Sequence, residues 1–152
     1  MRTPRRSFLQ TMVGTMLPRA DLPASSEEAV AEIFSLLPSR HYEWDPKAQK
    51  AVTTYGNRAD ADEACRKVFI LAKERPDAVP LYVRAALSWL CRKANSDAHD
   101  YKFLAAILED ATWVSPMWQP HLLAASVHFF HGEQSPDHPV VQQARAALEK
   151  MG

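Results

Sequence analysis

The feature that most constrains the fold is an apolar triplet, at spacing i, i+4, i+7, that recurs three times after residue 45. The triplets are Ala64/Val68/Leu71, Leu104/Leu108/Ala111 and Ala144/Leu148/Met151. This spacing puts the three members of each triplet on one face of a helix. Pro76 and Pro116 follow the first two triplets at the same distance, where a helix must already have ended. The repeat therefore predicts three amphipathic helices in a common register.

A second triplet, small–small–aromatic at spacing i, i+1, i+4, precedes each apolar triplet. Its copies are Ala51/Val52/Tyr55, Ala85/Ala86/Trp89 and Ala125/Ser126/Phe129. Small side chains allow two helix backbones to approach closely, and the aromatic side chain fills the remaining gap. Pro46, Pro80 and Pro120 stand ahead of these triplets, in the first helical turn where proline is tolerated. The proline spacing runs from 46 to 80 (34 residues) and from 80 to 120 (40 residues).

This pattern resembles the tetratricopeptide family of helix–turn–helix repeats, whose period is 34 residues. The family carries Ala, an aromatic and Ala on its second helix, where the first repeat here has Ala64, Val68 and Leu71. The resemblance implies an all-α fold, a right-handed array of about three helix-turn-helix hairpins over residues 25–152. We expect helices over 25–38, 45–56, 60–73, 78–93, 98–114, 117–131 and 139–151. The first of these begins with a capping box of Ser25 and Glu28.

The N-terminal segment, residues 1–24, fits two interpretations. Arg5-Arg6-Ser7-Phe8-Leu9 is similar to a twin-arginine export signal, although Pro4 and Gln10 depart from that pattern and Leu22-Pro23-Ala24 is a poor cleavage site. The other interpretation is an amphipathic helix. We therefore expect a cytoplasmic protein, with a periplasmic location if the arginine pair is a genuine signal.

Composition excludes several classes of function. The chain has 18 basic and 18 acidic residues, so bulk charge does not favour nucleic acid or an anionic membrane. No stretch is long and apolar enough to cross a membrane. Cys65 and Cys91 are expected to be free thiols in a reducing compartment, with a disulfide conceivable after export.

Motifs for catalysis or metal binding are absent from the sequence. His121, His128 and His131 lie at i, i+7, i+10 with His138 nearby, but this spacing fits no standard zinc pattern. No phosphate loop, nucleophile elbow or HExxH occurs, and no histidine is paired with either cysteine by the sequence. We expect no enzyme, no catalytic residue, no metal and no cofactor.

The predicted function is protein binding. In tetratricopeptide arrays the first helices of successive repeats line a concave surface, and the register implies these residues for it here: Val83, Leu87, Leu90, Leu123, Val127, Phe130 and His131. An apolar concave face must be covered in water. Either the 25–37 helix or the 8–17 stretch covers it, or an apolar extended or helical segment of a protein partner does.

These expectations describe an adaptor or chaperone, similar in size and repeat count to chaperones of type III secretion substrates. Two alternatives are an exported accessory subunit of a redox complex and a metal-binding helical protein that uses the histidines. The sequence leaves the oligomeric state open.

Overall fold

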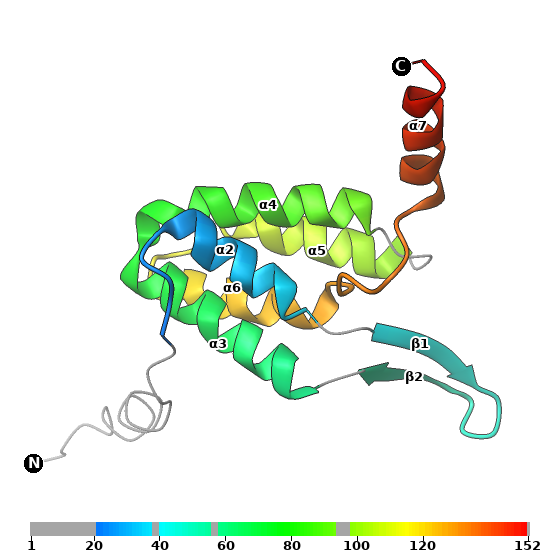
Figure 1. Ribbon diagram of the computed structural model, residues 1–152. Helices are drawn as coiled ribbons and strands as arrows, with labels where there is room; N and C mark the ends of the chain where they lie inside the picture. Colours follow the sequence, from blue (N-terminus) through cyan, green and yellow to red (C-terminus); the bar gives the residue numbers. More distant parts are fainter. Residues whose placement is uncertain (1–20, 38–39, 56–57, 94–97, 152) are drawn as a thin grey trace, which may run out of the picture.

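The computed structural model describes residues 21–37, 40–55, 58–93 and 98–151, and the protein is mainly α-helical over these ranges (Figure 1). The described elements are α2 (Ser26–Ser35), β1 (Arg40–Asp45), β2 (Lys50–Tyr55), α3 (Arg58–Glu74), η1 (Pro76–Ala78), α4 (Val79–Arg92), α5 (Ala98–Asp110), α6 (Gln119–Ser126), η2 (Val127–Phe129) and α7 (Pro139–Glu149). The labels η1 and η2 denote 3-10 helices. The Arg5-Arg6 motif and the stretch 8–17 both lie outside the described residues.

Local sequence signals place the ends of these helices. The Ser25 side chain accepts a hydrogen bond of 3.0 Å from the backbone N–H of Glu28, so α2 begins with the predicted cap. Pro80 and Pro120 occupy the first turns of α4 and α6, where their missing N–H groups cost no hydrogen bond. The predicted helices over 60–73, 78–93, 98–114 and 139–151 are all confirmed, with bounds shifted by a few residues.

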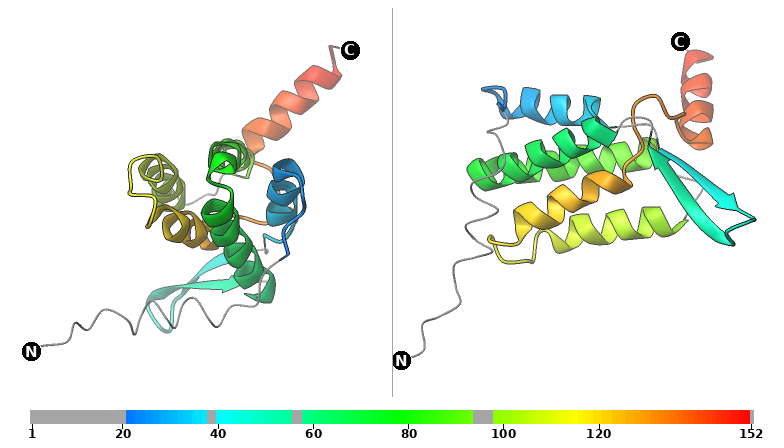
Figure 2. Two further views of the ribbon diagram at one scale, coloured as in Figure 1. Left: turned by 90° about the vertical axis from the view of Figure 1, so that its left-hand side faces the viewer. Right: turned by 90° about the horizontal axis from the view of Figure 1, so that it is seen from below.

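Helices α2 to α6 enclose one hydrophobic core (Figures 1 and 2). Its centre is the ring of Phe34 on α2, whose centroid lies 5.7 Å from that of Tyr82, 5.1 Å from that of Trp89 and 5.8 Å from that of Phe130. Buried Lys67 on α3 donates to the carbonyl oxygen of Asp21 at 2.8 Å and pairs with Glu32 at 3.1 Å. These contacts hold α2 against the other helices.

The helices form a closed bundle, and the stacked array implied by the tetratricopeptide resemblance is not seen. Helix α3 packs against α6, although α4 and α5 lie between them in the chain. In a stacked array each repeat contacts only its neighbours. Contact between the first and third predicted repeats instead closes the core.

The predicted helix over 45–56 is wrong, because this region forms an antiparallel β-hairpin that projects from the bundle (Figure 1). The register pairs Arg40 with Tyr55 and Asp45 with Lys50. Residues 52–55 are Val, Thr, Thr and Tyr, which favour strands over helices. Pro46 enters a turn that ends at Gln49, whose φ of 48° is left-handed.

Helix α7 forms as predicted but does not complete a third hairpin, since it points away from the bundle (Figures 1 and 2). None of its residues is buried. The preceding segment is tied to the end of α4 instead. Lys93, itself buried, donates to the carbonyl oxygens of Glu133 at 2.9 Å and Ser135 at 2.6 Å and pairs with Asp137 at 2.9 Å.

The central role of Phe34 predicts that Phe34→Ala costs about 3–5 kcal/mol of unfolding free energy, measured by urea denaturation. Phe103→Ala is the matched control. Phe103 is 45% exposed and makes one ring contact, with Phe129, so its loss should cost less than about 1.5 kcal/mol. Equal losses for the two variants would contradict the central position of Phe34.

The Asp137 anchor predicts a pH-dependent effect of Asp137→Asn. The hydrogen bond from Lys93, followed by the charges of Lys93, Arg145 and Arg92, lowers the pKa of this carboxyl below 3.8. A lowered folded-state pKa stabilises the protein above the unfolded value, and the stabilisation is lost as pH falls through the folded value. Thermal melts should therefore show the variant less stable than the parent at pH 7, with the difference shrinking as pH falls past 3.8 and lost once pH is below the lowered folded-state pKa. A difference that persists or grows in acid would refute the anchor.

Candidate functional site: a hollow between α3 and α6

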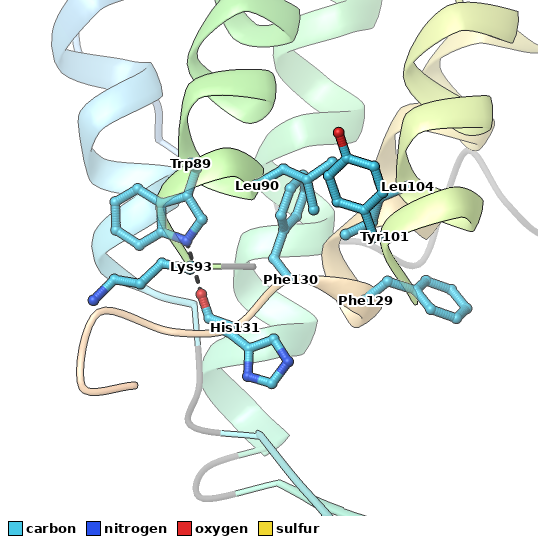
Figure 3. A pocket seen from close by; sticks show the side chains of 8 residues that line it. All are labelled: Trp89, Leu90, Lys93, Tyr101, Leu104, Phe129, Phe130 and His131. Carbon is cyan, nitrogen blue, oxygen red and sulfur yellow. Dashed lines mark hydrogen bonds between the residues drawn. The ribbon is translucent and has the colours of Figure 1, made fainter. Parts of the chain in front are cut away.

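The residues predicted to line one concave face lie in three different places. Leu123 and Val127 are core residues with at most 1% of their surface exposed. Leu90, Phe130 and His131 surround a cavity of about 10 Å³ at the end of α4 (Figure 3). That volume holds about one water molecule, so this cavity is not a binding pocket.

Val83 and Leu87 line a separate, open hollow between the start of α4 and the connection from α5 to α6. The predicted residues therefore do not line one shared groove. Leu123 and Val127 belong to the core, where α6 packs against α3, and the Phe34 ring of α2 packs edge-on against Phe130. The 25–37 helix therefore covers the predicted face at Phe130, whereas Leu87, at 43% exposed, is the most accessible of the predicted residues.

The hollow with the most varied chemistry lies between α3 and α6 and has a volume of about 630 Å³. Each helix contributes residues at i, i+3, i+4 and i+7, which share one helical face. From α3 and from the α6–η2 segment these are Asp62, Cys65, Arg66 and Phe69, and His121, Ala124, Ala125 and His128. The two alanines lie midway along the α6 side, so no large side chain from that helix fills the space.

A row of rings borders this hollow. The His121 ring lies 4.9 Å from that of Phe69 and 5.5 Å from that of Trp118, centroid to centroid. The ammonium of Lys73 lies 5.8 Å from the Phe69 centroid. The row therefore extends from α3 across α6 to the residue before it.

Trp118 belongs to a connection that exposes three large apolar side chains. Trp113 is 83% exposed, Met117 66% and Trp118 59%. Isolated exposed apolar residues are common on protein surfaces, whereas three large ones on a single connection form an unusually apolar stretch of exposed surface. We name the rings of Phe69, His121 and Trp118 the aromatic row, and Trp113 and Met117 are exposed on the connection that leads into it.

Cys65 does not have the character of an activated nucleophile. Burial, followed by the charge of Asp62, raises the pKa of this thiol above 9.0, against a smaller lowering by Arg66. Since the thiolate is the reactive form, Cys65 is a neutral thiol at pH 7. His121 and His128 line the same hollow, which the sequence had no means of showing.

The predicted histidine stripe is broken in the structure. Helix α6 ends at Ser126, a 3-10 turn follows, and the backbone becomes extended at Phe130. His121 and His128 therefore lie at the α3–α6 hollow, whereas His131 lies at the small cavity beside Lys93. Among the described side chains, no group of three or more His, Cys, Asp or Glu residues is placed to hold a metal ion.

Sequence reasoning passed over the aromatic row. One signal was available, because residues 111–118 connect two helices and yet contain two tryptophans and a methionine. Connections are usually polar, so large apolar residues in one need a partner. Their placement beside α3 depends on the α3–α6 contact, which no local pattern shows.

The fold and site together define a mainly α-helical bundle with a projecting hairpin, a projecting helix and an aromatic-bordered surface hollow. Comparison with protein-family models, curated proteins and solved structures found no match. Among the described residues, no helix has the length and apolar character that crossing a membrane requires.

The environment of Cys65 predicts unequal reactivity of the two cysteines. Cys91 is exposed and Cys65 is half-buried, so N-ethylmaleimide should modify Cys65 at least ~10-fold more slowly at pH 7. Its modification rate should still be rising with pH above 9.0. Mass spectrometry of tryptic peptides gives both rates. In a Cys91→Ser chain, one fast-reacting thiol would show that Cys65 is activated and would contradict the prediction.

Proposed function

We propose that this protein is a protein-binding module, an adaptor or chaperone, that takes an apolar segment of a partner protein at the α3–α6 hollow and its aromatic row. The observation that supports this proposal is the exposure of Trp113, Met117 and Trp118 on one connection, whose last residue, Trp118, contacts His121 at the border of an open hollow. Tryptophan and methionine are enriched at protein interfaces, and buried tryptophans are frequent hot spots.

The shape and charge of the hollow favour a protein segment as the ligand. The hollow is an open trough between two helices, and a helix or strand presents side chains to such a surface at regular spacing. Its two fully charged side chains, Asp62 and Arg66, have opposite signs. No excess of positive charge is present there to recruit phosphate groups.

The partner's apolar side chains would contact the hollow above Ala124 and Ala125, with Trp118 and Phe69 at its border. Packing of α3 against α6 holds this surface in place before binding, so little ordering of the backbone is required. The exposed tryptophans then lose contact with water on binding, which is the main favourable term.

The other functions considered from the sequence gain no support from the described residues. Arg5 and Arg6 lie outside them, so the export signal and the choice between cytoplasm and periplasm stay predictions. The histidines do not form a metal-binding group there.

A photo-crosslinking amino acid placed at Trp118 tests the proposed surface. In the native cell, the full-length chain should give a discrete protein adduct from position 118. The matched control is position 87, where Leu87 is also exposed but belongs to the face predicted from the tetratricopeptide resemblance. Adducts from position 87 alone would place binding on that other face and reject the present site.

The affinity of the partner for variants of this surface then measures how much the aromatic row and its connection contribute to binding. Once the adduct identifies the partner, Met117→Ala/Trp118→Ala should weaken its Kd by ~30-fold or more, the loss expected for a hot spot of about 2 kcal/mol. Leu87→Ala should change Kd by less than ~3-fold. Tryptophan fluorescence or calorimetry gives both values. Absence of any adduct from either position would reject the protein-binding function itself.

A further inference from the structure

Helix α7 is amphipathic, and its apolar face is left uncovered by the described residues. Val140, Leu148 and Met151 are 62%, 64% and 76% exposed. At 100° per residue they share an arc of roughly 120° with Val141, Ala144 and Ala147. The opposite side carries Gln142 and Glu149, together with Ala146. An apolar face of this kind stabilises a helix only when it is buried.

The direction of α7 is set by contacts at its first turns. The backbone N–H of His138 donates to the carbonyl oxygen of Arg92 at 2.8 Å. Asp137 accepts from Lys93 at 2.9 Å, and Arg145, in the second turn of α7, pairs with the same carboxylate at 2.6 Å. Folding α7 back over its own bundle would break these contacts. These contacts therefore keep the apolar face of α7 off its own bundle and exposed.

The bundle has a complementary apolar hollow on a different side from the α3–α6 hollow. It lies between α2 and α4, has a volume of about 270 Å³ and is lined by Val30, Ala31, Phe34, Leu81, Ala85 and Trp89, with Glu27 at its far end. Arg92 connects this hollow to α7, since its guanidinium lies 4.3 Å from the Trp89 ring centroid and 3.8 Å from Asp137. Helix α7 therefore starts next to the Trp89 end of the hollow.

We infer that two copies of this chain associate by reciprocal exchange, each placing the apolar face of α7 in the α2–α4 hollow of the other. A two-fold axis near Arg92 brings both helix–hollow pairs together, and exchange of an identical element is a common route to such dimers. The hollow spans Leu81 to Trp89 of α4, roughly 12 Å at 1.5 Å per residue. The apolar face from Val141 to Leu148 spans roughly 10 Å on the same scale.

Charge also favours a second copy as the occupant. The hollow is bordered by acidic residues of α2, Glu27 at its far end and Glu28 beside it, and no basic residue lines it. Lys150 follows α7 directly and lies beside its apolar arc, at the end that would reach Glu27. The favoured orientation thus puts the start of α7 at Trp89 and its end at Glu27.

The test is the association state of the full-length chain, measured by light scattering after size exclusion over a concentration series. The parent chain should reach the mass of a dimer. Leu148→Glu on α7 and Ala31→Glu in the hollow should each weaken the dimer by ~10-fold or more. The matched control, Ala146→Glu, adds the same charge on the opposite side of α7 and should leave the dimer intact. All three positions are exposed, so circular dichroism should show the bundle still folded.

Disulfide trapping separates exchange from folding back. In a chain with Cys65→Ser and Cys91→Ser, the added pair Ala31→Cys and Ala144→Cys should give a covalent dimer under mild oxidation. An internal crosslink within a monomer would overturn the proposal, as would a parent chain that stays monomeric throughout. A dimer insensitive to Leu148→Glu or Ala31→Glu would overturn it too. None of these residues belongs to the aromatic row, so failure here leaves the proposed function intact.

Discussion

The packing of Phe34 against rings from α4 and from the segment after α6 is the contact on which the rest of the bundle depends. Three rings lie within 5.8 Å of it, centroid to centroid. An aromatic ring buries more apolar area than any other kind of side chain, and this one joins residues about 50 and 100 positions apart in the chain. By packing over Phe130, α2 covers one side of the core that the α3–α6 contact closes.

The α3–α6 contact and the packing of α2 together decide where apolar surface remains. Leu123, Val127 and Phe130 are buried inside, so they have no surface to offer a partner. The large exposed apolar residues are then concentrated on the connection before α6 and on α7. These two regions lie on separate elements, so the partner binding that we propose and the exchange between copies that we infer use different surfaces.

Sequence patterns predicted the helix boundaries well because those depend on local chemistry. Ser25 caps α2 through its own side chain, and Pro80 and Pro120 start helices by lacking an N–H. The same proline signal gave a wrong helix at Pro46, because proline begins a turn just as readily as a helix. The β-branched residues that follow it favour strands. Local patterns could not predict which helices pack against each other. The α3–α6 contact and the Lys93–Asp137 ion pair at the start of α7 both join residues that are distant in the sequence.

The triplet Ala125/Ser126/Phe129 shows why a local pattern did not place its residues at one contact. The sequence assigned all three to one tight helix contact. In the structure Ser126 is buried, donating to the Leu123 carbonyl oxygen at 2.6 Å and lying 3.4 Å from the Tyr82 hydroxyl. Phe129 pairs with Phe103, and Ala125 faces the α3–α6 hollow. Ala125 leaves open space between α6 and α3, whereas Ser126 allows close approach to Tyr82 of α4. Only the fold distinguishes the two cases, so the position of the candidate hollow follows from how the helices pack and not from the local pattern.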